Sequence, residues 1–124
     1  MKRNAGFTVI ELFSALVVVL VIASLVIVQK NTIDATRRDQ DRKTAVNAMY
    51  YGLKNAFFLQ NNHYPTQINP TVLPYIDPTH FKLIGDDKKY KVTYRGLDCK
   101  GTTCQRFELR VPLEKEATYI KKSE

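Results

Sequence analysis

An apolar run near the start of the chain most constrains what it can fold into. From Phe7 to Val28, all but four of 22 residues are apolar. The four exceptions are Thr8, Glu11, Ser14 and Ser24. As a helix that rises ~1.5 Å per residue, this run is roughly 33 Å long, enough to cross the hydrocarbon core of a bilayer. The run therefore predicts a transmembrane helix over residues 7–28, although a plain membrane anchor has the same hydropathy.

The residues before the run distinguish it from a secretory signal. Residues 1–6 are short and charged and end in a glycine, and the apolar run follows this glycine directly. A secretory signal instead places its small-residue cleavage site after the apolar region, so that the apolar part is discarded. A cut between Gly6 and Phe7 would keep the helix and expose a new amine at its tip.

The sequence G-F-T-V-I-E, at positions 6–11, closely resembles the N-terminal motif of type IV pilins and pseudopilins. The resemblance implies that a prepilin peptidase removes residues 1–6 by cutting after Gly6, and that the new N-terminus, Phe7, is methylated. It also implies that Thr8 and Glu11 serve in assembly. The expected product is a structural subunit of a filament, not an enzyme.

The resemblance also predicts partners and location. Before assembly, the subunit is expected to be a single-pass protein of the cytoplasmic membrane with its N-terminus inside. An inner-membrane assembly machinery is then expected to add it to an extracellular homo-oligomeric filament. Adhesion and motility are the functions associated with such pili. Alternatives within the same family are a pseudopilin of type II secretion or competence, and a minor pilin whose head binds DNA or a surface ligand.

Glu11 is the residue of the apolar run that most needs a partner. An ionised carboxylate in hydrocarbon costs several kcal/mol unless it is paired. In the family's filament the acid at this position faces the N-terminal amine of a neighbouring subunit, which has an ordinary pKa of ~7.7–8.0 and is charged at neutral pH. The alternative is local: Glu11 lies in the first turns and complements the dipole of its own helix.

The basic balance of the chain does not indicate nucleic acid. The formal charge is +7, but two of the 19 Lys and Arg residues, Lys2 and Arg3, lie in the expected leader. The remaining 17 are scattered among 12 Asp and Glu residues, and no basic run exceeds two residues. Such a distribution is more typical of a soluble surface than of a nucleic-acid footprint.

The helix is expected to continue beyond the membrane over residues 29–62, because no proline occurs before Pro65. Residues 31–44 are polar all round and predict a solvated surface; the alternative is that their charges pair between subunits. An apolar stripe at i, i+3, i+4 spacing follows and predicts the face that holds the core. Its members are Val46, Met49, Tyr50, Leu53, Ala56, Phe57 and Gln60.

Two positions favour an unbroken helix. Many major pilins carry glycine where this chain has Leu20 and proline where it has Val28. We therefore expect one helix over residues 7–62, about 84 Å long at ~1.5 Å per residue. We also expect this helix to enter the filament largely unbroken. It should end in the segment Asn61–Pro65, which resembles the N-G-x-Y-P element of pilins.

Residues 63–124 are expected to form a globular head. Three prolines at positions 70, 74 and 78 predict an irregular connection over 66–84. Alternating apolar residues predict strands over 90–95 and 107–111, and a shorter one over 118–121. The expected fold class is α+β: a long N-terminal helix, transmembrane in its first half and amphipathic in its second, packed against an antiparallel sheet of about three strands.

Cys99 and Cys104 flank the expected hairpin tip and favour a disulfide, which would stabilise the chain by ~2–3 kcal/mol at most. Zinc would need about four ligands, and His63 and His80 lie in the distant connection. A redox pair would want the closer C-x-x-C spacing. Calcium has only weak candidate ligands, which are Asp86, Asp87 and Asp98. The sequence therefore predicts neither a metal nor a cofactor, and no catalytic motif was found.

Overall fold

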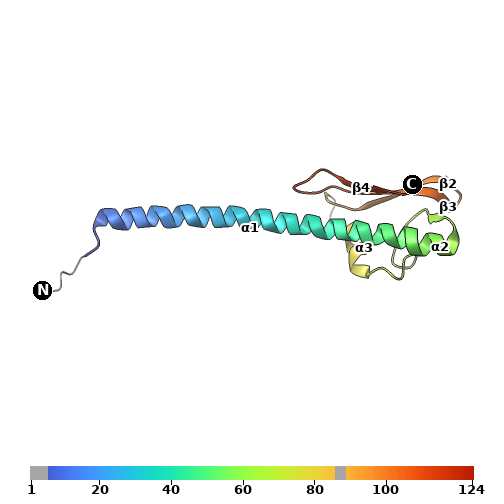
Figure 1. Ribbon diagram of the computed structural model, residues 1–124, viewed down its shortest axis with the longest axis horizontal. Helices are drawn as coiled ribbons and strands as arrows, with labels where there is room; N and C mark the ends of the chain where they lie inside the picture. The colour runs from blue at the N-terminus through green and yellow to red at the C-terminus, as the bar shows by residue number, and fades with distance from the viewer. Residues whose placement is uncertain (1–5, 86–88) are drawn as a thin grey trace. The chain divides into compact units, whose positions relative to one another are not determined.

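The computed structural model describes residues 6–85 and 89–124 (Figure 1). The chain divides into two compact units, Met1–Asp34 and Ala35–Glu124. Helix α1, Val9–Gly52, contributes residues to both units. The expected leader, residues 1–6, lies outside the described residues except for Gly6.

The long helix predicted from the sequence is present and runs without interruption through Leu20 and Val28. After α1, the chain makes one π-helical turn, η1 (Leu53–Phe57), and a last α-helical turn, α2 (Phe58–Asn61). The helix ends where predicted, because Asn62 adopts the left-handed conformation with φ 55°. Its N–H donates to the carbonyl of Phe58 at 2.7 Å, which is a typical helix C-cap.

The π-helical turn was not predicted, and it changes which residues meet the core. A π turn inserts one extra residue and so shifts the buried face along the sequence. As a result Phe58 is half-buried as well as Phe57, and it stacks on Tyr64 with ring centres 4.9 Å apart. Gln60, expected at the end of the stripe, is exposed.

All strands of the second unit belong to one antiparallel sheet. The strands are β1 (Tyr64–Pro65), β2 (Thr93–Lys100), β3 (Thr103–Val111) and β4 (Tyr119–Lys122). Strand β3 pairs with β2 along one edge, from Thr93 opposite Arg110 to Lys100 opposite Thr103. Its other edge is shared by β1 and β4, which pair with successive parts of β3. The α+β prediction is therefore confirmed.

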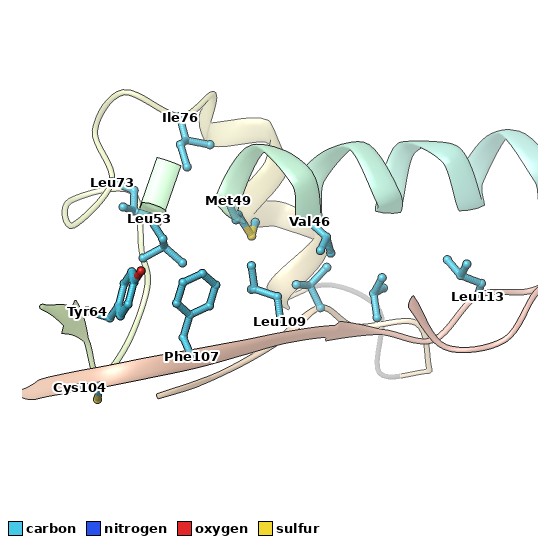
Figure 2. Packing of buried hydrophobic residues seen from close by; sticks show 12 residues of the cluster. Val46, Met49, Leu53, Tyr64, Leu73, Ile76, Cys104, Phe107, Leu109 and Leu113 are labelled. Atoms are coloured by element: carbon cyan, nitrogen blue, oxygen red, sulfur yellow. The ribbon is translucent and has the colours of Figure 1, made fainter. Parts of the chain in front are cut away.

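The core lies between the second half of α1 and the sheet (Figure 2). The predicted stripe supplies Val46, Met49 and Leu53, all fully buried. Opposite them, alternate residues of β3 point inward, as the pattern predicted, and are also fully buried. These are Phe107, Leu109 and Val111.

The connection over 66–84 is more regular than predicted. Its last part forms helix α3, Pro78–Gly85. Asp77 caps this helix, because its Oδ1 accepts a hydrogen bond from the Thr79 N–H at 2.8 Å, and Pro78 suits the first helical position. The first long strand also lies later than expected, at 93–100 instead of 90–95. The side chains predicted to face inward are nevertheless the less exposed ones, since Val92 is buried and Tyr94 is half-buried.

Candidate functional site

The described residues of the first unit form a mainly apolar helix, and their side chains are exposed. Every residue from Gly6 to Asp34 is exposed, and the side chains at the tip are the most open, with Phe7 83% and Ile10 82% exposed. By length and composition this helix is able to cross a membrane. An apolar surface of this extent marks a region that is covered by lipid or by another protein.

Thr8 and Glu11 meet at the start of α1. The backbone N–H of Glu11 donates to the Thr8 side-chain oxygen at 3.3 Å and to the Thr8 carbonyl at 3.0 Å. Thr8 is thus the N-cap and Glu11 the third helical residue, the spacing of a capping box. Among the described residues, the Glu11 carboxylate makes no hydrogen bond or ion pair, so it remains available to a partner outside the chain.

The second unit holds a buried acid on the helix. Asp39 is 1% exposed. Its carboxylate accepts hydrogen bonds from two backbone N–H groups of the β3–β4 loop, residues 112–118. The Glu114 N–H lies 2.8 Å from Oδ1 and 3.0 Å from Oδ2, and the Lys115 N–H lies 2.9 Å from Oδ2. The helix therefore holds the backbone of the loop.

Glu114 of this loop in turn binds two arginines of the helix, Arg38 and Arg42. Its two carboxylate oxygens accept from Nε and Nη2 of Arg38 at 2.8 and 2.7 Å, a bidentate pair. Nη1 of Arg42 lies 2.8 Å from Glu114 and 2.9 Å from Asp39, and its guanidinium stacks on Tyr90 at 4.5 Å from the ring centre. We call Arg38, Asp39, Arg42 and Glu114 the helix–loop cluster.

The acids of the helix–loop cluster are held ionised. Burial alone raises the pKa of Asp39, but the hydrogen bonds from the Glu114 and Lys115 N–H groups and from Arg42 outweigh it, so that the net pKa is lowered. Hydrogen bonds from Arg38 and then Arg42 lower the pKa of Glu114 to about 2. Both carboxylates are therefore ionised at neutral pH.

This cluster corrects one expectation. Residues 31–44 were predicted to be a solvated surface, which is wrong for Asp39 and Arg42, because the loop covers both side chains. Nearby, Lys43 binds Glu116 of the same loop at 2.6 Å. The sequence did carry a signal: Glu114 and Glu116 follow the predicted strand and complement the basic residues of the helix.

The cysteines lie together at the hairpin tip. Cys99 and Cys104 occupy opposite positions of β2 and β3 and form a disulfide. A Cβ built on Gly96 would lie 2.5 Å from Sγ of Cys104 and 3.0 Å from Sγ of Cys99, so only glycine leaves room for the bond there. Gly101 begins the two-residue turn with φ +63°, a conformation that favours glycine.

No candidate metal site occurs in residues 6–85 and 89–124, since no group of three or more His, Cys, Asp or Glu side chains gathers there. His63 lies against Phe57 with its Nδ1 2.7 Å from the carbonyl of Asn61. Asp98 binds Arg106 at 2.6 Å. The other weak calcium candidates, Asp86 and Asp87, lie outside the described residues.

No known protein family, curated protein or solved structure matches this chain.

Proposed function

We propose that this chain is a structural subunit of a type IV pilus-like filament and polymerises through its N-terminal helix. One observation carries the proposal: the motif G-F-T-V-I-E stands at the start of an apolar helix, and every residue from Gly6 to Asp34 is exposed. A simple anchor explains the apolar helix equally well, but it gives no reason for a glycine before the helix and an acid at Glu11.

The proposed maturation begins with removal of residues 1–6 after Gly6, followed by methylation of the Phe7 amine. The helix stores the subunit in the cytoplasmic membrane, with its N-terminus inside, until the assembly machinery extracts it. In the extracellular filament, the Glu11 carboxylate pairs with the Phe7 amine of a neighbouring subunit. Each charge is expensive alone in an apolar environment, so the pairing fixes the axial register of the packed helices.

The intramolecular geometry at the helix start is compatible with this role. The cap uses the Glu11 backbone N–H and the Thr8 side chain, and it leaves the Glu11 carboxylate unpaired within the described part of the chain. Local capping and intermolecular pairing therefore use different atoms of Glu11, and one does not exclude the other.

Intact mass spectrometry of filaments sheared from cells tests the proposal. We expect a chain that begins at methylated Phe7 and carries the Cys99–Cys104 bond, as the main component of the filaments. Gly6→Ala should leave an uncut precursor in the membrane, whereas Ala5→Gly, next to the cut, should be processed. Normal processing of Gly6→Ala would refute the leader assignment. A trace amount of the chain in filaments would instead favour a minor pilin.

A further inference from the structure

The outward face of the sheet carries an arginine to which the described residues supply no partner. Arg95 is exposed on β2, directly opposite Glu108 of β3. Glu108 already binds Arg110 at 2.8 Å and Lys122 at 3.1 Å. In the described part of the chain, the Arg95 guanidinium makes no hydrogen bond or ion pair. It borders a hollow of about 160 Å³, so its charge faces solvent.

A second hollow lies where α1 meets α3. It is lined by an acid that also lacks a partner among the described residues. Its volume is about 280 Å³, and its lining consists of Asp41, Thr44, Thr79, His80 and Leu83. Asp41 is exposed and, within residues 6–85 and 89–124, its carboxylate pairs with nothing. The Thr79 hydroxyl donates to Asp77 at 2.8 Å, which leaves its oxygen free to accept a hydrogen bond from a ligand.

The chemistry of the second hollow suits a guanidinium. A carboxylate together with hydroxyl oxygens matches the several N–H donors that arginine presents in a fixed plane. At ~30 Å³ for each water in the liquid, a hollow of this size holds several waters, so it accommodates the head of one arginine side chain.

The two hollows lie on opposite sides of the second unit. In Figure 1 the sheet lies on one side of the helix and α3 on the other. Arg95 points away from the helix on the outer side of the sheet, whereas the Asp41 hollow lies at α3. Two complementary patches placed in this way cannot satisfy each other within one copy, but they can join one copy to the next in a head-to-tail contact that propagates.

We propose that Arg95 of one subunit inserts into the Asp41 hollow of a second copy, as a contact between heads that rests on the proposed filament role. The net positive charge of the chain makes copies repel in general, so a specific contact must set opposite charges against each other. Arg95 and Asp41 form such a pair, and neither has a partner among the described residues of its own chain.

Cross-linking of assembled filaments tests the contact directly. Carbodiimide joins an amine to a carboxylate without a spacer, so filaments of the Arg95→Lys variant should yield a peptide that links positions 95 and 41 of two chains. Adding Asp41→Asn should abolish that peptide. If wild-type filaments contain this chain but the Arg95→Lys filaments give no such peptide, the contact is wrong and the filament role still stands. If the wild-type chain enters no filament, both proposals fall.

A charge swap gives an independent measure. Arg95→Asp and Asp41→Arg should each reduce filament yield about fivefold, an effect of ~1 kcal/mol, which is typical of a partly exposed ion pair. The double variant should recover to within about twofold of wild type, since it restores the pair in reverse. Lys100→Asp changes the net charge as Arg95→Asp does, at an exposed side chain near the hairpin tip and outside the helix–loop cluster, and should have no effect. Equal losses for Lys100→Asp and Arg95→Asp, or no recovery in the double variant, would refute the contact.

Discussion

Replacing Asp39 by alanine should destabilise the second unit more than any substitution of an exposed acid. The carboxylate is buried and holds the Glu114 and Lys115 N–H groups, with oxygen to nitrogen distances of 2.8 to 3.0 Å. Asp39→Ala removes all of these bonds and also a carboxylate that contacts Arg42. The loop then remains attached through Glu114, through the outer pair of Lys43 and Glu116, and through the buried side chain of Leu113.

The expected loss follows from these contacts. A buried N–H group left without a partner costs about 1–3 kcal/mol, and removing one member of a buried ion pair costs about 3–5 kcal/mol. The two effects overlap, and Arg42 keeps Glu114, so we expect about 3–5 kcal/mol in total. Domains of this kind have about 5–15 kcal/mol of net stability, so the variant retains a marginal fold at most.

Urea unfolding of the full chain in detergent micelles measures this loss. The chain has seven tyrosines and no tryptophan, so tyrosine fluorescence reports on the head. With a slope of about 2 kcal/mol per molar urea, the midpoint should fall by roughly 2 M. Asp41→Ala is the matched control, because Asp41 is exposed two residues away, and its stability should change by less than about 0.5 kcal/mol. If the two variants unfold within about 1 kcal/mol of each other, the described role of Asp39 is wrong.

Three further predictions concern the disulfide, acid stability and assembly. Gly96→Ala should destabilise the oxidised chain by about 1–3 kcal/mol, because the added Cβ would clash with Sγ of Cys104. In a chain that also carries Cys99→Ala and Cys104→Ala, the same substitution should cost less stability. Thermal unfolding of the chains with and without Gly96→Ala, in each background, measures the difference. Glu114 has its pKa lowered from 4.5 to about 2, so its stabilising effect is fully present above about pH 4.5 and is lost as the pH falls towards 2. Glu114→Gln should therefore flatten the fall of the melting temperature over that range, and an unchanged slope would count against the ion pairs with Arg38 and Arg42. Glu11→Ala should mature normally yet give about tenfold fewer filaments, as expected if the lost pairing is worth ~1.4 kcal/mol, while Ser14→Ala should assemble like wild type.

The sequence predicted those parts of the fold that depend on periodicity. The i, i+3, i+4 stripe located the buried face of α1 at Val46, Met49 and Leu53, and the alternation of Phe107, Leu109 and Val111 located the inner face of β3. Burial of apolar side chains decides both, and their spacing is visible without coordinates.

Features that depend on distant partners were missed. The cluster around Asp39 needs a loop about 75 residues further along the chain, and local patterns cannot specify that partner. Strand β1 has only two residues and exists because β3 offers it an edge. Helix α3 is different, since the sequence itself carries a helix-start signal for it, Asp77 followed by Pro78.

The helix–loop cluster also bears on the order in which the second unit folds. The hairpin of β2 and β3 closes across a two-residue turn, whereas Asp39 meets Glu114 only after a segment of 75 residues has been brought together. Closing the longer loop costs more chain entropy and is rewarded only once the sheet lies against the helix. We therefore expect docking of the β3–β4 loop to be the last step of folding, so that the finished cluster distinguishes a completed head from one whose sheet alone has formed.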